Sequence, residues 1–171
     1  VEPGLVLIDK PTDWTSHDVV AKVRKAVGTK KVGHAGTLDP LATGLLVLGI
    51  ESGTKLLTFL VGADKTYLAT IRLGVSTVSD DSQSEILKTA TPATLASVSP
   101  EDIEREMNKL TGVISQRPSS VSAIKVDGKR AYDLVRSGEE VSLKSRDVTV
   151  SAFELLSSSK STEGFIDLEV K

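Results

Sequence analysis

The chain of 171 residues has an ordinary globular composition, 39% hydrophobic and 26% charged, with a formal net charge of −2 and no cysteine. The length is enough for one domain with a sizeable core, and the lack of cysteine excludes a disulfide framework, a thiol nucleophile and a cysteine-based zinc site. Because the sequence has only two histidines, no apolar run of the roughly 20 residues that span a bilayer and no opening signal peptide, we expect a cytoplasmic protein that binds neither metal nor membrane.

The first half of the sequence predicts short strands around one clear helix. Thr15, followed by Asp18 three residues later, is a capping-box pattern and predicts a helix over about 16–27 that ends at Gly28. Apolar residues at helical spacing give this helix one buried face. The other expected elements are a strand at 5–8, a fully buried strand at 45–50, a short helix at 54–60 and a strand at 67–73 with one polar face.

The second half predicts more loop. Residues 76–99 are rich in serine, threonine and aspartate and predict a long loop with one edge strand. Ser99 and Pro100, followed by two acids, are typical of a helix start and predict a helix to about Leu110. The remaining ranges predict a loop at 116–125, a short basic helix at 129–136, and strands at 148–155 and 165–170 around a serine-rich turn at 157–162. Together the elements indicate one α+β domain.

The segment 33–49 combines glycines, a proline, a histidine and one carboxylate just before and into an apolar run. Glycine serves where the backbone must turn with positive φ or approach another group closely, so this segment is a shaped loop. Asp39 is the only acid over residues 19–50, and Pro40 disfavours a helical conformation for it. A lone carboxylate on such a loop, with His34 five residues earlier, is a candidate catalytic group.

The residues alone also allow simpler structural roles. Asp39 would cap a helix whose first residue is Pro40, and His34 would be a loop imidazole bonded to the backbone. Tyr67, near the start of the strand at 67–73, would pack against its neighbours. The loop lacks the glycine patterns of phosphate-binding loops, and the absence of a Gly-x-Ser-x-Gly elbow argues against a Ser-His-Asp hydrolase.

Charge is segregated along the chain. Residues 10–31 carry six basic and two acidic side chains and residues 117–136 carry five and two, whereas residues 79–109 carry three basic and seven acidic ones. Two basic faces of this kind would meet a phosphate backbone. Solvated helix faces show the same pattern, so composition leaves both interpretations open.

The order of the motifs resembles the TruB family of tRNA pseudouridine synthases. The resemblance begins with Asp-Lys-Pro at 9–11 and Thr-Ser at 15–16, and it is most specific for Gly-His-Ala-Gly-Thr-Leu-Asp-Pro-Leu-Ala-Thr-Gly-Leu-Leu at 33–46. It continues through Ala-Asp-Lys-Thr-Tyr at 63–67 and resumes over 116–132, so it covers nearly the whole chain. It implies a pseudouridine synthase fold, α+β with a mixed, mostly antiparallel sheet flanked by helices.

The resemblance implies a role for each candidate residue. Asp39 matches the catalytic aspartate that initiates cleavage of the uridine N-glycosidic bond, and His34 matches a histidine that helps to hold the flipped-out RNA. Tyr67 matches a tyrosine that packs against the target uracil and helps to remove its C5 proton. The implied reaction, isomerisation of the T-loop uridine at position 55 of tRNA, needs no cofactor and no metal. Residues expected to contact the RNA backbone are Lys10, Lys30, Lys31, Lys125, Lys129 and Arg130.

The resemblance also implies boundaries. Residues 1–171 would form the N-terminal part of a catalytic domain, with an RNA-contacting insertion at about 114–142, in a monomer that acts on the T-arm of tRNA. The rest of the domain, with an arginine that pairs with Asp39, and a small RNA-binding domain would follow Lys171, so we expect the chain by itself to have very low activity. An RNA-binding or RNA-folding module with an inactive site is the alternative from another class, and a guide-RNA-dependent, rRNA-modifying relative is a weaker alternative.

Overall fold

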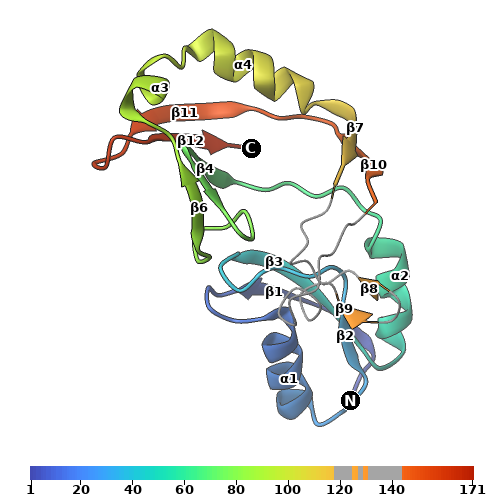
Figure 1. Ribbon diagram of the computed structural model, residues 1–171. Helices are drawn as coiled ribbons and strands as arrows, with labels where there is room; N and C mark the ends of the chain where they lie inside the picture. Colours follow the sequence, from blue (N-terminus) through green and yellow to red (C-terminus); the bar gives the residue numbers. More distant parts are fainter. Residues whose placement is uncertain (118–124, 127–128, 131–143) are drawn as a thin grey trace. The chain divides into compact units, whose positions relative to one another are not determined.

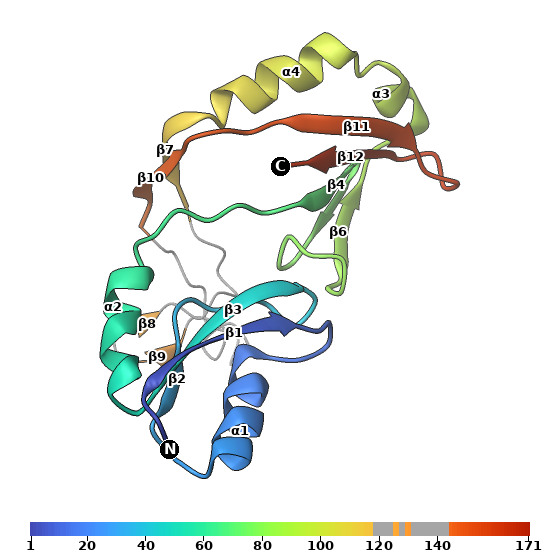
Figure 2. The same ribbon diagram turned by 180° about the vertical axis from the view of Figure 1, so that it is seen from behind.

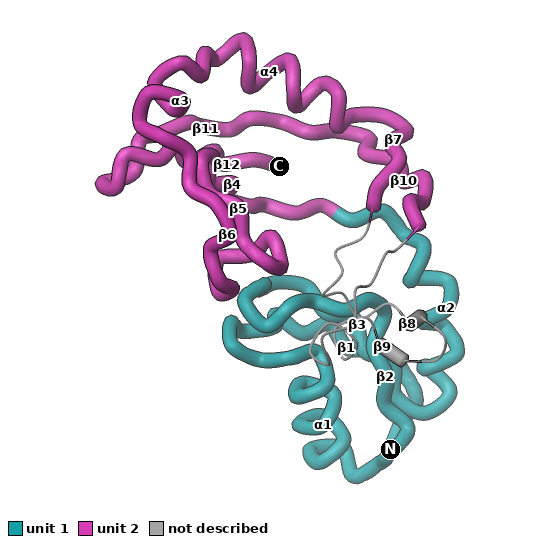
Figure 3. The backbone as a smooth tube through the Cα atoms, viewed as in Figure 1, with its two compact units in different colours: residues 1–65 teal, residues 66–171 magenta. Residues whose placement is uncertain are grey.

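The computed structural model describes residues 1–117, 125–126, 129–130 and 144–171. The chain divides into two units, 1–65 and 66–171 (Figure 3). Each unit combines helices with sheets, and every strand pairing among the described residues is antiparallel. The predicted α+β class is therefore confirmed.

The first unit is a three-stranded sheet in the order β1-β3-β2, with one long helix against one face (Figures 1 and 2). β1 pairs with β3 from Gly4, opposite Ile50, to Lys10, opposite Gly44. The elements are β1 (Gly4–Lys10), α1 (Ser16–Val27), β2 (Val32–His34), β3 (Gly44–Ile50), the 3-10 helix η1 (Glu51–Leu56) and α2 (Leu57–Leu60).

Helix α1 has the bounds that its capping box predicts. The hydroxyl of Thr15 accepts a hydrogen bond from the Asp18 amide at 3.0 Å, and the Asp18 carboxylate accepts one from the Thr15 amide at 2.9 Å. Gly28 ends the helix with a φ of 72°, a conformation that glycine adopts without strain. The apolar face of α1 packs on the sheet to form a core of Val19, Val20, Val32, Leu46, Leu48 and Ile50.

The prediction that the strand at 45–50 is fully buried is wrong. Leu46 and Leu48 point into the core and are buried, whereas Leu45 is 66% exposed. Leu7 of β1, which pairs with Val47 of β3, is 67% exposed. Successive side chains of a strand point to opposite faces, and the described residues cover only the face that meets α1. The expected helix at 54–60 also starts earlier, as η1 and α2 together.

The second unit is a sheet in the order β11-β12-β4 with α4 packed on it. Ile103 and Met107 of α4 meet Ile166, Leu168 and Val170 of β12 in the core of this unit. Its elements are β4 (Ala69–Leu73), β5 (Val75–Thr77), β6 (Ile86–Thr89), α3 (Pro92–Ala96), α4 (Pro100–Lys109), β7 (Gly112–Gln116), β8 (Lys125–Val126), β9 (Lys129–Arg130), β10 (Arg146–Val150), β11 (Leu155–Lys160) and β12 (Ile166–Val170).

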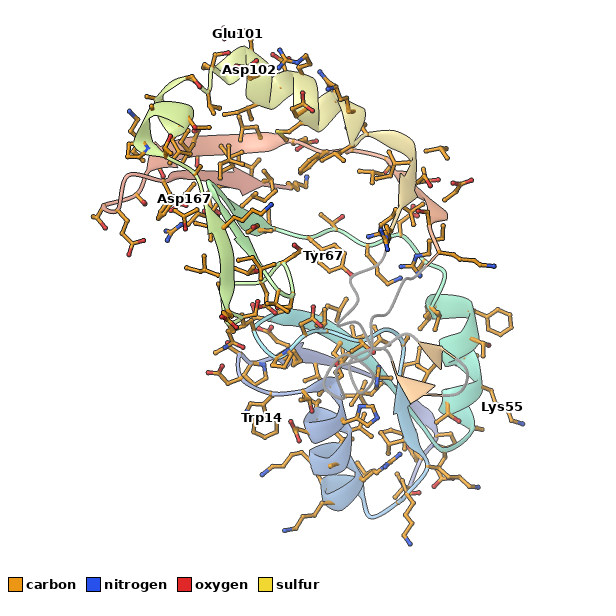
Figure 4. The ribbon with its side chains drawn as sticks, viewed as in Figure 1. Trp14, Lys55, Tyr67, Glu101, Asp102 and Asp167 are labelled. Carbon is orange, nitrogen blue, oxygen red and sulfur yellow. The ribbon has the colours of Figure 1, made fainter. Side chains whose placement is uncertain are left out.

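Helix α4 begins where the sequence predicts. The Ser99 hydroxyl accepts a hydrogen bond from the Asp102 amide, and the Asp102 carboxylate accepts one from the Ser99 amide. Figure 4 shows Glu101 and Asp102 in the first turn, where the positive end of the helix dipole stabilises negatively charged side chains. The helix ends at Lys109, one residue before the expected end.

Several predictions for this unit fail where strand pairing decides the structure, among them the strand expected at 148–155, since β10 ends at Val150 and β11 begins at Leu155. Residues 76–99 contain most of the β5–β6 hairpin and all of α3, whereas the sequence predicted a long loop with a single edge strand. The serines at 157–159 belong to β11 and pair with β12, so the turn comes after them. Lys129 and Arg130 form β9, paired with β8, in place of the start of a helix. The rest of that expected helix, 131–136, and most of the loop expected at 116–125 lie outside the described residues.

Strands β7 and β10 pair with each other and bracket the region between them. Gln116 at the end of β7 lies opposite Arg146 at the start of β10. A chain that leaves the sheet at Gln116 therefore returns to it at the neighbouring position. Most of the insertion expected at about 114–142 falls between these two residues, largely outside the described part of the chain.

We predict that Gly53→Ala destabilises the first unit. A Cβ atom at Gly53 would lie 2.2 Å from the carbonyl oxygen of Gly4, and both groups belong to backbone that packs closely. We expect the free energy of unfolding in urea to fall by about 1–3 kcal/mol. Gly62→Ala is the control, since no heavy atom lies within 4 Å of its added Cβ, and it should change stability by less than about 0.5 kcal/mol. Equal effects of the two substitutions would contradict the close approach.

We predict that Asp167 makes the second unit sensitive to acid. Its carboxylate accepts hydrogen bonds from Nε and Nη2 of Arg72, both at 2.8 Å, directly across the β4–β12 ladder. These bonds, and the charge of Arg72, lower the pKa of Asp167 below its ordinary value of 3.8. The stabilisation is therefore complete at neutral pH and is lost as the pH falls through 3.8 toward the lowered pKa.

Urea denaturation at a series of pH values tests this dependence. Asp167→Asn should lower stability at pH 7 and should flatten the decline that the unsubstituted chain shows below pH of about 4. An identical decline in both proteins would show that other groups cause the sensitivity to acid.

Candidate active site

Asp39 lies on the segment 35–43, which joins β2 to β3 in the first unit. No helix follows it, and its carbonyl oxygen instead accepts a hydrogen bond from the Ala42 amide at 3.0 Å. The role of a helix cap, which the sequence left open, is thus excluded. The Asp39 side chain is exposed, while Leu38 beside it packs against the core. The segment therefore presents its carboxylate to solvent from an anchored backbone.

The hydroxyl of Ser16 anchors the residue before Asp39. Ser16 Oγ accepts a hydrogen bond from the Leu38 amide at 2.9 Å and donates one to the Leu38 carbonyl oxygen at 3.1 Å. Ser16 is only 1% exposed, in the first turn of α1. One side chain thus satisfies both backbone groups of Leu38, which have no ladder partner in this irregular segment.

The ammonium group of Lys10 anchors the residue after Asp39. Its Nζ donates to the carbonyl oxygens of Trp14 at 2.6 Å, Pro11 at 2.9 Å and Pro40 at 3.2 Å. Three acceptors match the three protons of an ammonium group, and the Lys10 residue is 0% exposed. Trp14, beside the start of α1 in Figure 4, belongs to the loop that this ammonium holds to Pro40.

This geometry corrects the expectation that Lys10 contacts the RNA backbone. A phosphate requires an ammonium at the surface, and that of Lys10 is enclosed by carbonyl oxygens of its own unit. The signal was present in the sequence, because Lys10 has the same strand parity as Val6 and Ile8, which pack against the core. Ser16 was also missed, although it precedes the buried Val19 and Val20 by one helical turn.

Backbone contacts complete the frame around Asp39. The Asp13 amide donates to the Pro40 carbonyl oxygen at 2.8 Å, and the Thr12 hydroxyl donates to that of Leu41 at 3.4 Å. The segment between β1 and α1 is therefore bonded to the segment that carries Asp39. Asp13 has a φ of 64°, a conformation that aspartate tolerates better than most residues.

His34 is the last residue of β2, and its imidazole Nδ1 contacts the carbonyl oxygen of Gly36. Since a carbonyl only accepts, Nδ1 carries the proton and Nε2 of the neutral ring is an acceptor. The ring also meets that of His17 edge to face, with centroids 5.6 Å apart. The structural role considered for His34, a backbone-bonded imidazole, is confirmed, and this bond sets the orientation of its second nitrogen.

The remaining candidates belong to other segments of the chain. Tyr67 belongs to the second unit, where it precedes β4 with an exposed side chain (Figure 4). Lys30 and Lys31 are exposed in the connection between α1 and β2, and Lys31 Nζ lies 3.5 Å from a carboxylate oxygen of Glu51. The other basic candidates, Lys125, Lys129 and Arg130, form backbone pairs in β8 and β9.

Asp18 is a second carboxylate near the start of α1, and its surroundings give it a different task. Its oxygen accepts hydrogen bonds from the hydroxyl and the amide of Thr15, and these bonds lower the pKa of Asp18. It is therefore an ionised helix cap. Within the described ranges, no group of three or more histidine, cysteine, aspartate or glutamate side chains is placed to hold a metal ion, and no helix is both long and apolar enough to cross a membrane.

Comparison with known sequences identifies the family of this chain and several of its relatives. The chain matches the N-terminal domain of TruB family pseudouridylate synthases over residues 24–171. The tRNA pseudouridine synthase B of Leifsonia xyli subsp. xyli is 62% identical over 98% of this chain and 55% of its own length. That of Corynebacterium diphtheriae is 50% identical over 99% of this chain and 56% of its own length. The chain thus spans about half the length of the curated relatives it matches.

Solved structures give a more distant likeness. A chain in the crystal structure of a Cbf5-Nop10-Gar1 complex is 27% identical, with a TM-score of 0.61 over 98% of this chain and 39% of that one. A chain in an H/ACA RNP bound to a substrate RNA containing 2′-deoxyuridine is 25% identical, with a TM-score of 0.57 over 98% and 37%. The fold is therefore shared with a chain of the Cbf5-Nop10-Gar1 complex and with a chain of an H/ACA RNP bound to a substrate RNA.

We predict that Lys10→Met destabilises the first unit although it keeps an apolar stem of similar length. The substitution takes the ammonium donor of the buried Lys10 away from the carbonyl oxygens of Pro11 and Trp14, and it leaves the Pro40 carbonyl oxygen with only the Asp13 amide. We expect the free energy of unfolding to fall by at least about 1–3 kcal/mol, the cost of unsatisfied buried polar groups. Lys22→Met, at an exposed position of α1, is the matched control and should have little effect. If both variants unfold at the same urea concentration as the parent, the ammonium does not hold the loop.

Proposed function

This chain belongs to the TruB family of pseudouridylate synthases, and on that premise we propose that it is the N-terminal part of the catalytic domain of a tRNA pseudouridine synthase. The proposed substrate is the T-loop uridine at position 55 of tRNA, and the proposed product is pseudouridine. Relatives named tRNA pseudouridine synthase B, 62% and 50% identical over nearly all of this chain, support the choice of tRNA. The RNP and complex chains, at 25–27% identity, are more distant.

The observation that carries the proposal is an exposed carboxylate between two anchored residues. Asp39 follows Leu38, held by Ser16, and precedes Pro40, held by Lys10. A reaction within one nucleotide requires a catalytic group whose position does not drift, because misplacement by about 1 Å costs around a hundredfold in rate. The backbone around Asp39 meets that requirement before any substrate binds.

The proposed reaction exchanges one bond of uridine for another. Asp39 initiates cleavage of the bond between N1 of uracil and C1′ of ribose, the detached base rotates, and C5 bonds to C1′. The C5 proton leaves and N1 gains a proton, so atoms and electrons balance without redox change or hydrolysis. Water would capture the detached intermediate, so the site must be closed by RNA or protein during the reaction.

The other candidate residues have supporting roles in this proposal. The target base must leave its stack to reach Asp39. Tyr67 would pack against the extruded uracil and assist removal of its C5 proton, and His34 would hold the flipped region through Nε2, with Nδ1 occupied by Gly36. Exposed Lys30 and Lys31, with Lys125, Lys129 and Arg130, would contact phosphates. We further propose a cytoplasmic monomer that binds the T-arm.

An RNA-binding or RNA-folding module with an incomplete site is the second candidate. The observation that favours it is length, since the chain corresponds to only 55% and 56% of its two cited relatives. Residues that complete the site in those relatives would then be supplied by the remaining length. The two candidates differ in whether a chain of full length modifies RNA.

We predict that length and Asp39 together determine activity. The test protein is this chain fused after Lys171 to the remaining C-terminal part of the Leifsonia xyli relative. Tritium release from a tRNA transcript labelled at C5 of uridine measures the loss of the C5 proton, and a transcript with cytidine at position 55 is the substrate control. We expect the fusion protein to be active, the chain alone to have very low activity, and Asp39→Asn in the fusion protein to reduce turnover at least about a hundredfold with tRNA affinity retained.

Asp13→Asn is the matched control, because Asp13 lies on the neighbouring segment and asparagine tolerates its positive φ. Its turnover should be close to that of the unsubstituted fusion protein. Turnover retained by Asp39→Asn would contradict the proposed role of Asp39. Equal tRNA binding without modification, by both the fusion protein and its Asp39→Asn variant, would favour the RNA-binding module.

A further inference from the structure

The Ser16 hydroxyl makes two hydrogen bonds, and both are with one residue of the segment that carries Asp39. It accepts from the Leu38 amide at 2.9 Å and donates to the Leu38 carbonyl oxygen at 3.1 Å. A serine hydroxyl has a single proton to donate, and at 1% exposure that of Ser16 is shielded from water. The only proton of the hydroxyl is therefore donated to Leu38, and the two hydrogen bonds are shielded from water.

The hydrogen bond that Ser16 donates to the Leu38 carbonyl oxygen fixes the peptide plane that leads into Asp39, and the one it accepts from the Leu38 amide fixes the peptide plane before that. The Leu38 carbonyl oxygen and the Asp39 amide belong to the same planar peptide group. Holding the Leu38 oxygen therefore fixes the direction of the N–Cα bond about which Asp39 rotates. On the other side of Asp39, the carbonyl oxygen of Pro40 accepts a hydrogen bond from Lys10. Leu38 is also held by its side chain, which packs on the core that includes Val19 and Val20 of α1.

The helix does not need the hydroxyl of Ser16 for its own start. Thr15 and Asp18 form the capping box of α1 through their own side chains and amides. Both hydrogen bonds from Ser16 Oγ instead cross 22 positions of sequence to the segment before Asp39. The buried hydroxyl thus couples a rigid helix to the catalytic segment.

From this geometry we infer that Ser16 is a positioning residue for Asp39, acting through the backbone of Leu38. The inference rests on the proposed function of Asp39 and goes beyond it, since it assigns the alignment of the carboxylate to a side chain on another element. Without the hydroxyl, the two peptide groups on either side of Leu38 each lose their partner on α1, and the carboxylate of Asp39 samples other orientations. Substrate binding through the phosphate contacts remains.

The kinetic test uses the fusion protein described above. Ser16→Ala should lower kcat for the tRNA transcript by roughly ten- to a hundredfold, the effect of displacing a catalytic group, with KM nearly unchanged. Ser16→Thr keeps a hydroxyl and should recover part of kcat. Thr54→Ala is the matched control, because it removes another partly buried hydroxyl, bonded to the Glu51 carbonyl oxygen at 2.7 Å, in the same unit. It should leave kcat unchanged.

A structural readout on the 171-residue chain is independent of activity. Ser16→Ala should accelerate hydrogen exchange at the Leu38 amide and shift the carboxyl carbon resonance of Asp39, whereas Thr54→Ala should do neither. The Ala35 amide, bonded to the Val47 carbonyl oxygen at 2.9 Å, is the internal reference and should exchange at the same rate in all proteins.

The outcomes separate the two proposals. An unchanged Leu38 amide and Asp39 resonance in Ser16→Ala would overturn the inference, as would a loss of kcat that Thr54→Ala reproduces. An inactive unsubstituted fusion protein would contradict the proposed function, and the exchange and resonance measurements would then decide by themselves whether Ser16 orients Asp39.

Discussion

A buried ammonium group holds together the two segments on which the proposed role of Asp39 depends. Lys10 ends β1 with its side chain on the core side, where burying an unpaired charge is costly. The cost is offset because three carbonyl oxygens, from Pro11, Trp14 and Pro40, surround Nζ within hydrogen-bond distance. The charge therefore dictates the path of two separate segments, which converge on it because neither strand nor helix provides these carbonyl groups with partners.

Hydrogen bonds from side chains to backbone groups also explain how an irregular segment presents one exposed carboxylate. Residues 35–43 belong to no strand, so their backbone groups find partners one by one, and several of these partners are side chains of other elements. Ser16 supplies both partners for Leu38, and Lys10 supplies one for Pro40. Asp39, between them, keeps its side chain in solvent.

The sequence was sufficient for features that a few neighbouring residues determine. The capping box at Thr15, and the helix start of Ser99 and Pro100 followed by two acids, predicted their helices to within a residue, because each signal lies within one helical turn. The glycine-rich segment and its lone acid were equally visible. Features set by distant partners were not. Ser157–Ser159 have the composition of a turn, yet β12 supplies a ladder that makes them a strand. Lys10 was assigned by its charge to a surface, although its parity in β1 placed it inside.

The pairing of β7 with β10 has a consequence for how such a protein can vary. Gln116 and Arg146 face each other across the ladder, so the two ends of the intervening chain are held at a fixed short separation. The entropy of closing a loop grows only slowly with its length, and neither strand changes register when residues are added or removed between those ends. The number of residues between Gln116 and Arg146 can therefore change while the pairing of β7 with β10 stays the same.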